Sequence, residues 1–125
     1  MLSGKVNARR EAVVRLWIRG PSDPALEIEA IVDTGFTGSL TLPQSDVTRL
    51  GLVWRGRGEG LLADGTSSFF GVYEAIVLWH RQPRSISVHA VESKPLLGMT
   101  MLDGNEFAMQ VVEGGEVAIH KLSVS

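Results

Sequence analysis

The chain has 125 residues, a formal net charge of −2 at pH 7, 44% hydrophobic residues and no cysteine. This length predicts one domain, residues 1–125, with a single hydrophobic core. Without cysteine the chain forms no disulfide framework and no zinc–thiolate site, which is compatible with a reducing cytoplasm. Residues 1–10 lack the apolar run of a signal peptide, and no stretch reaches the roughly 18 apolar residues of a membrane span. We therefore expect a soluble, cytoplasmic protein that does not bind a membrane.

Two strand-like segments come first in the chain. In both, apolar and polar side chains alternate with the period of two that is typical of a half-buried β-strand. The apolar faces consist of Ala12, Val14, Leu16 and Ile18 in the first segment and of Leu26, Ile28, Ala30 and Val32 in the second. Glu27 and Glu29 lie on the opposite face of the second segment.

A carboxylate follows the second strand directly. Asp33 begins the sequence Asp-Thr-Gly-Phe-Thr-Gly. Such a carboxylate is costly unless it is solvated, hydrogen-bonded or paired. Gly35 and Gly38 let the backbone approach closely, so a tight loop can turn N–H groups toward the carboxylate. The motif alone leaves two interpretations open: Asp33 caps a turn, as in many Asp-x-Gly loops, or it has a chemical role.

A helix and a basic segment come next. Residues 43–50 suit a helix, because Pro43 fits a first turn and Gly51 fits the position after a last turn. Residues 54–58, Trp-Arg-Gly-Arg-Gly, are the densest basic segment. Two arginines between glycines suit a phosphate backbone, but the chain has no net positive charge to attract nucleic acid. We therefore expect a solvated loop at 54–58 and no nucleic-acid partner.

Two hairpins are predicted in the middle of the chain. Asp64-Gly65, flanked by apolar residues, is typical of a two-residue type I′ turn. Residues 72–80 and 85–91 are strand-like, and the turn-like residues 81–84 separate them.

A third hairpin is predicted near the C-terminus. Residues 106–112 and 116–122 alternate like strands, and Glu113-Gly114-Gly115 joins them. A short helix at 99–102, closed by Gly104, precedes them. The sequence therefore predicts a mainly β protein with six to eight short strands, one or two short helices, and a small closed barrel or sandwich.

Residues 95–104 carry the second half of a recognisable pattern. They read Pro-Leu-Leu-Gly-Met-Thr-Met-Leu-Asp-Gly, so two leucines and a glycine precede the short helix. A strand that ends in Asp-Thr-Gly, followed about 60 residues later by Leu-Leu-Gly and a short helix, resembles the retropepsin-like aspartic proteases. The Asp-Thr-Gly-Phe form is most similar to the bacterial branch, and the resemblance covers residues 12–122. It implies the small closed β-barrel of the one-lobe acid proteases and an aspartic endopeptidase without cofactor or metal.

The resemblance also implies roles for single residues. Asp33 would be catalytic. Thr34 would hydrogen-bond across a dimer beneath the carboxylates, and Gly35 would leave room for the attacking water. The residues that would support this loop from below are Leu96, Leu97 and Gly98.

The hairpin around Ala63, Asp64 and Gly65 would be a flap that closes over an extended peptide. Phe36 departs from the pattern, because many relatives carry a small residue there. It would either narrow the cleft or pack at the interface. Met99 and Thr100 also differ from the polar residues that viral enzymes show after their glycine.

The sequence gives little support for dinucleotide binding or metal binding. Residues 56–61 fail the dinucleotide pattern because Leu61 replaces its third glycine, and the three histidines have no metal-ligand spacing. We therefore expect no cofactor and no metal.

Amide hydrolysis by aspartates needs two carboxylates about 3 Å apart that share one proton. The chain contains one Asp-Thr-Gly. An active enzyme would therefore be a homodimer that cleaves peptide or protein substrates, with Asp33 of each copy at the two-fold axis. Two alternatives stay open: a catalytically silent peptide-binding or structural dimer, and a β-barrel that binds another ligand and uses Asp33 as a turn residue.

Overall fold

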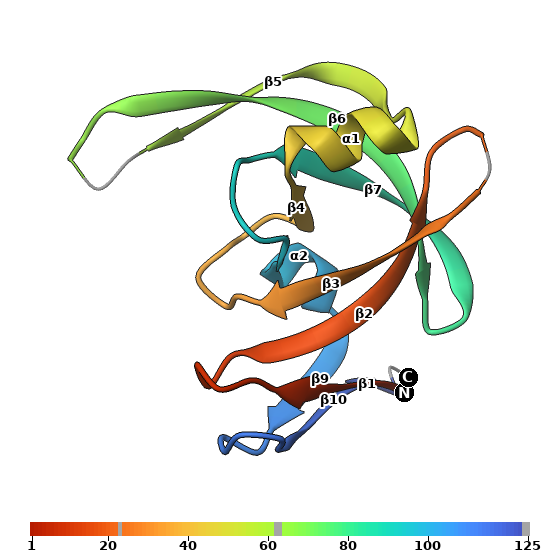
Figure 1. The fold of residues 1–125 in the computed structure, drawn as a ribbon, viewed down its shortest axis with the longest axis vertical. Helices are drawn as coiled ribbons and strands as arrows, with labels where there is room; N and C mark the ends of the chain where they lie inside the picture. Colours follow the sequence, from red (N-terminus) through yellow and green to blue (C-terminus); the bar gives the residue numbers. More distant parts are fainter. Residues whose placement is uncertain (23, 62–63, 124–125) are drawn as a thin grey trace.

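The computed structural model describes residues 1–22, 24–61 and 64–123. Within these residues the chain forms ten strands and two short helices. Six strands close into a barrel in the order β6, β7, β4, β8, β3 and β2, and β2 pairs again with β6 (Figure 1). Their bounds are β2 (Ala12–Arg19), β3 (Leu26–Val32), β4 (Leu40–Leu42), β6 (Ser67–Trp79), β7 (Gln82–Ala90) and β8 (Leu96–Leu97). The predicted mainly β class with a closed barrel is confirmed, whereas the predicted six to eight strands are too few, because the described residues form ten.

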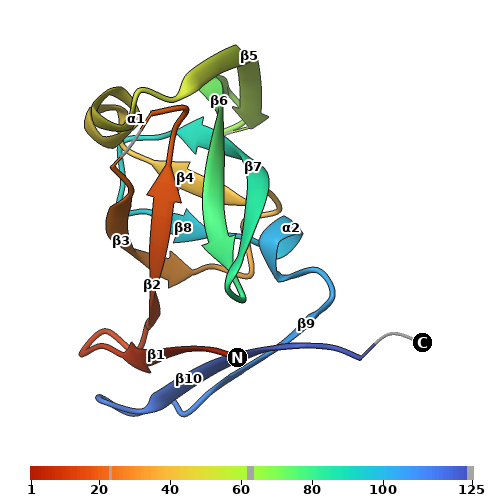
Figure 2. The same cartoon turned by 90° about the vertical axis from the view of Figure 1, so that its right-hand side faces the viewer.

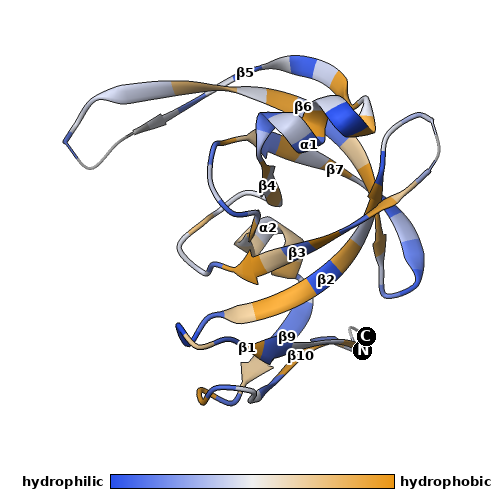
Figure 3. Ribbon diagram, viewed as in Figure 1, coloured by the Kyte–Doolittle hydropathy of each residue, from blue (hydrophilic) through white to orange (hydrophobic). Residues whose placement is uncertain are grey.

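The barrel interior is built from the alternating strands. Figure 3 shows hydrophobic and hydrophilic residues alternating along β2 and β3. The four apolar residues predicted for β2 are all buried, and Glu27 and Glu29 of β3 are exposed. Among the core residues with no exposed surface are Val14, Ile18, Ala30, Leu40, Leu42, Val77, Val88, Leu97, Met101 and Ile119. Burial of these side chains is the main stabilising contribution to the fold.

Three strands form a layer beneath the barrel (Figure 2). They are β1 (Leu2–Val6), β9 (Asn105–Met109) and β10 (Glu116–Lys121). β1 pairs with both β2 and β10, and β10 pairs with β9, which confirms the predicted C-terminal hairpin. β9 is the last strand of the sheet, so one of its edges lacks a partner strand within the described residues.

A long hairpin extends beyond the barrel (Figure 1). It is formed by β6 and β5 (Val53–Leu61), which pair from Val53↔Glu74 to Leu61↔Ser67. The loop expected at residues 54–58 is wrong, because these residues belong to β5. Glycines at alternate positions obscure the strand pattern in this segment, and Gly56 adopts a φ of +147° at an irregularity in the pairing.

The turn between β6 and β7 also differs from the expectation. We predicted it at residues 81–84, but Trp79 pairs with Gln82, so His80 and Arg81 form the turn. Both residues have positive φ, 49° and 66°, as a type I′ turn requires. Pro83 lies within β7 and not in the turn.

Both predicted helices are present. α1 (Gln44–Leu50) begins after Pro43 and ends at Gly51, whose φ is +63°. α2 (Met99–Leu102) lies under the loop that follows β3. Neither helix of the described residues has the length or apolar character needed to span a bilayer.

Candidate active site

Asp33 lies immediately after β3, at the start of a tight loop. Its N–H donates to the Leu97 carbonyl over 2.9 Å, and its own carbonyl accepts from the Phe36 N–H over 3.1 Å. One carboxylate oxygen accepts from the Gly35 N–H over 2.9 Å. Asp33 is half-buried, whereas Thr34 and Gly35 are exposed. The carboxylate is therefore held in place from its own loop and remains accessible from solvent.

Gly35 lies close to the Asp33 carboxylate. A Cβ at this position would lie 3.2 Å from the Asp33 Oδ1 atom, which is a tight contact. A larger side chain would crowd the space in front of the carboxylate.

The Leu-Leu-Gly segment, residues 96–98, packs against the loop that begins at Asp33. β8 pairs in parallel with the end of β3, with Leu97 opposite Val32. Leu97 is fully buried and Leu96 is half-buried. The Met99 N–H donates to the Phe36 carbonyl over 2.8 Å, so the helix that follows is also bonded to the loop. The structure therefore brings the predicted supporting residues into contact with the Asp33 loop.

Gly98 has no room for a side chain. A Cβ there would lie 2.2 Å from the Gly38 carbonyl oxygen and 2.5 Å from the Phe36 ring. The Gly98 N–H donates to the Ser39 carbonyl over 3.0 Å. The glycine therefore allows two segments far apart in the chain to cross closely.

The β5–β6 hairpin has a connection longer than the predicted type I′ turn. Regular pairing ends at Leu61↔Ser67, which leaves residues 62–66 between the strands. Asp64 accepts hydrogen bonds from the Thr66 N–H (2.9 Å) and the Thr66 hydroxyl (2.6 Å), and these bonds lower the pKa of Asp64. Gly65 has a φ of +88°. Ala63, predicted near the tip, lies outside the described residues.

An aromatic cluster connects this hairpin to the Asp33 loop. The Phe70 ring of β6 stacks on His89 of β7 with ring centroids 4.5 Å apart and an interplanar angle of 30°. The Phe36 ring meets the same imidazole edge-on, with centroids 5.6 Å apart. Burial lowers the pKa of His89. Sequence reasoning missed this cluster, because nothing in the local pattern links positions 36, 70 and 89.

A groove adjoins the loop on the side of α2 and β9. Its volume is about 520 Å³, and Thr34, Met99, Leu102 and Phe107 are among its lining residues. Met99 leaves 45% of its surface exposed. The exposed Met99 side chain and the β9 residues Asn105 and Phe107 therefore line the same groove as the predicted site residue Thr34.

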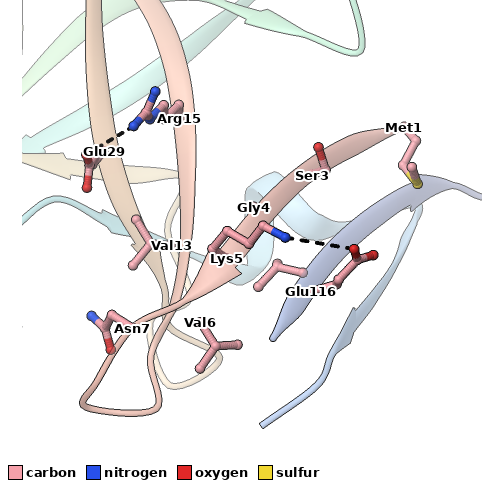
Figure 4. Close-up of a pocket in the computed structure, with 11 residues that line it drawn as sticks. Met1, Ser3, Gly4, Lys5, Val6, Asn7, Val13, Arg15, Glu29 and Glu116 are labelled. Atoms are coloured by element: carbon pink, nitrogen blue, oxygen red, sulfur yellow. Dashed lines mark ion pairs between the residues drawn. The ribbon is translucent and has the colours of Figure 1, made fainter. Parts of the chain in front are cut away.

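A larger cavity, of about 630 Å³, lies away from Asp33, where β1 meets β2 and β10. Figure 4 shows two ion pairs in it, Lys5–Glu116 at 3.8 Å and Arg15–Glu29 at 3.9 Å. All four side chains are largely exposed, so these pairs contribute little to stability. Within the described ranges, no three His, Asp or Glu side chains gather closely enough to hold a metal ion.

No protein-family model, curated protein or solved structure matches this chain. A function for the site therefore has to be argued from its geometry and chemistry.

Proposed function

We propose that the protein is an aspartic endopeptidase of the retropepsin-like type, active as a homodimer. The observation that carries this proposal is the position of Asp33. Its carboxylate sits in an accessible loop and accepts from the Gly35 N–H, and the same loop packs against Gly98 through Phe36 and Gly38.

The chemistry requires a second carboxylate. One carboxylate can remove a proton from water, but the departing amine and the carbonyl oxygen need an acid. Each chain supplies one Asp-Thr-Gly loop. Two copies related by a two-fold axis bring two Asp33 side chains together, and the pair keeps one proton because both cannot ionise at about 3 Å.

The proposed reaction uses the two Asp33 carboxyl groups in turn. The ionised group takes a proton from a water held between them, and the water oxygen attacks the peptide carbonyl carbon. The protonated group donates its proton to the carbonyl oxygen. The carbon–nitrogen bond then breaks as a proton passes to the amine. Because the pair titrates as a unit, we expect a bell-shaped rate profile with an acidic to near-neutral optimum.

The groove beside Thr34 is the proposed seat of the second copy. It is lined by Thr34, by the exposed Met99 and by Phe107 of β9, a strand with one edge that has no partner strand within the described residues. Pairing of an exposed strand edge with a second chain is a common way to satisfy its backbone groups. A partner placed there brings its own Thr34 and Asp33 toward the same axis.

The β5–β6 hairpin is the proposed flap. It extends from the barrel on the same side as the loop between β3 and β4 (Figure 1). A hairpin in this position can cover an extended peptide and donate backbone hydrogen bonds to it.

The test compares Asp33→Asn with the matched control Asp46→Asn, which lies on α1 and pairs with Arg49. Each protein is incubated with a mixed peptide library, and the products are identified by mass spectrometry. We expect cleavage by wild type and by the control, and loss of at least about 1,000-fold in Asp33→Asn. Equal cleavage by Asp33→Asn would contradict the proposal. A dimer without cleavage that is thermally stabilised by a hydroxyl-containing peptide analogue would instead indicate a silent peptide-binding dimer.

A further inference from the structure

Glycines make room for two phenyl rings between the hairpin and the Asp33 loop. A Cβ at Gly58 of β5 would lie 2.3 Å from the Phe70 ring. A Cβ at Gly38 would lie 2.5 Å from the Phe36 ring, and one at Gly98 would meet the same ring. Each ring therefore lies directly on backbone that carries no side chain. Such close packing fixes both rings in position.

His89 stands between these two rings. It lies on β7, opposite Val72 of β6 and Thr41 of β4, so its backbone belongs to the barrel wall. Its imidazole stacks on Phe70 and receives the edge of Phe36. A single side chain of the barrel thus contacts both the hairpin and the loop.

Phe70 lies on the part of β6 that pairs with β5 and not with β7. β6 pairs with β7 from Val72 to Trp79, and its first residues, Ser67 to Gly71, pair with β5. Phe70 therefore lies beyond the point where β6 leaves the barrel wall. Its ring reaches back to the barrel through His89.

We propose that His89 is a positioning residue that fixes the β5–β6 hairpin relative to the Asp33 loop, because its imidazole stacks on Phe70 and receives the edge of Phe36. The catalytic consequence rests on the proposed function: in the enzyme, His89 sets the distance between flap and carboxylates. Without the stack the hairpin samples more open positions, and substrate binding weakens before the chemical step changes.

Two substitutions separate ring stacking from simple filling of space. His89→Leu and His89→Phe are both apolar and uncharged, and only Phe keeps a flat ring. Phe70→Leu removes the stack from the hairpin side. Amide hydrogen exchange is measured in the whole protein at one pH for the described residues of the hairpin, 53–61 and 67–71. Strand β10, residues 116–121, serves as the internal control.

We expect hairpin exchange to rise about tenfold in His89→Leu and Phe70→Leu, and by less than about threefold in His89→Phe, with β10 unchanged. The double variant His89→Leu/Phe70→Leu should exceed the single variants by little, since both remove the same contact. Unchanged hairpin exchange in His89→Leu would overturn the proposal. An equal rise in β10 would also overturn it, because the loss would then be global.

Peptide cleavage gives a second readout. His89→Leu should raise KM about tenfold with a smaller change in kcat, and His89→Phe should restore most of the loss. The exchange measurement needs no cleavage. If hairpin exchange rises in His89→Leu but wild type cleaves no peptide, only the proposed function is contradicted. If exchange is unchanged and wild type cleaves peptides, only the role of His89 is contradicted.

Discussion

The backbone of Gly98 lies against the ring of Phe36, close enough that a Cβ on Gly98 would come within 2.5 Å of it. The Met99 N–H, one residue later, donates to the Phe36 carbonyl over 2.8 Å. Phe36, whose role the sequence left open between cleft and interface, thus packs within its own chain against Gly98 and His89. This packing makes the loop that carries Asp33 and the segment that supports it one unit.

Gly98→Ala should therefore be strongly destabilising. The added methyl group meets the Gly38 carbonyl oxygen, which is backbone and cannot rotate away. We expect a loss of about 3 kcal/mol in the free energy of unfolding, measured by urea denaturation. The matched control is Gly60→Ala on β5, where a Cβ would make an ordinary contact at 3.6 Å. It should change stability by less than about 1 kcal/mol. Equal stability of the two variants would show that the crossing is not tightly packed.

Met99→Glu should weaken the proposed dimer. Met99 is 45% exposed and lines the groove beside Thr34, so a carboxylate there places two like charges near the two-fold axis. We expect the dissociation constant from sedimentation velocity to rise at least about tenfold. Leu78→Glu is the control, because Leu78 is 44% exposed but lies outside this groove. A dimer equally affected by both variants, or by neither, would place the interface elsewhere.

Stability should depend on the protonation of His89. Burial lowers its pKa below the ordinary value of 6.5, so the folded protein favours the neutral ring. Between these two pKa values the unfolded chain binds more protons. The contribution of neutral His89 to the free energy of unfolding is therefore fully present above pH 6.5. It is lost as the pH falls toward the pKa of His89 in the folded protein.

The measurement is the urea midpoint at pH values from 7.5 to 5, compared between wild type and His89→Phe. The variant should lose less stability on acidification, because its ring does not titrate. Identical pH dependence in the two proteins would show that His89 does not titrate differently on folding.

Much of the barrel was predictable because its strands alternate. β2 and β3 carry apolar residues at every second position, and Gly114 marks the last hairpin with a φ of +79°. β4 was not predicted as a strand, because a segment of three residues shows no period. Nor did the residue types reveal the turn at His80 and Arg81, since positive φ is uncommon for residues other than glycine.

The candidate site was predictable in part. Asp33 and Gly98 stand in local motifs, and the structure places their segments in contact. The contact between Phe70 and His89 depends on where the pairing of β6 with β7 ends, and no local sequence motif predicts that point. Asp33 was expected to follow a buried strand. In the structure its side chain is half-buried.

The most direct test of the central claim, that two chains share one pair of carboxylates, mixes wild type with Asp33→Asn. Equal amounts are exchanged to equilibrium, and peptide cleavage is measured at constant total chain concentration. If one site needs both carboxylates, mixed dimers are inactive, and activity should fall to about one quarter of the wild-type value. A fall to only about one half would show that each chain acts alone, and that result, like a wild type without any cleavage, would contradict the account.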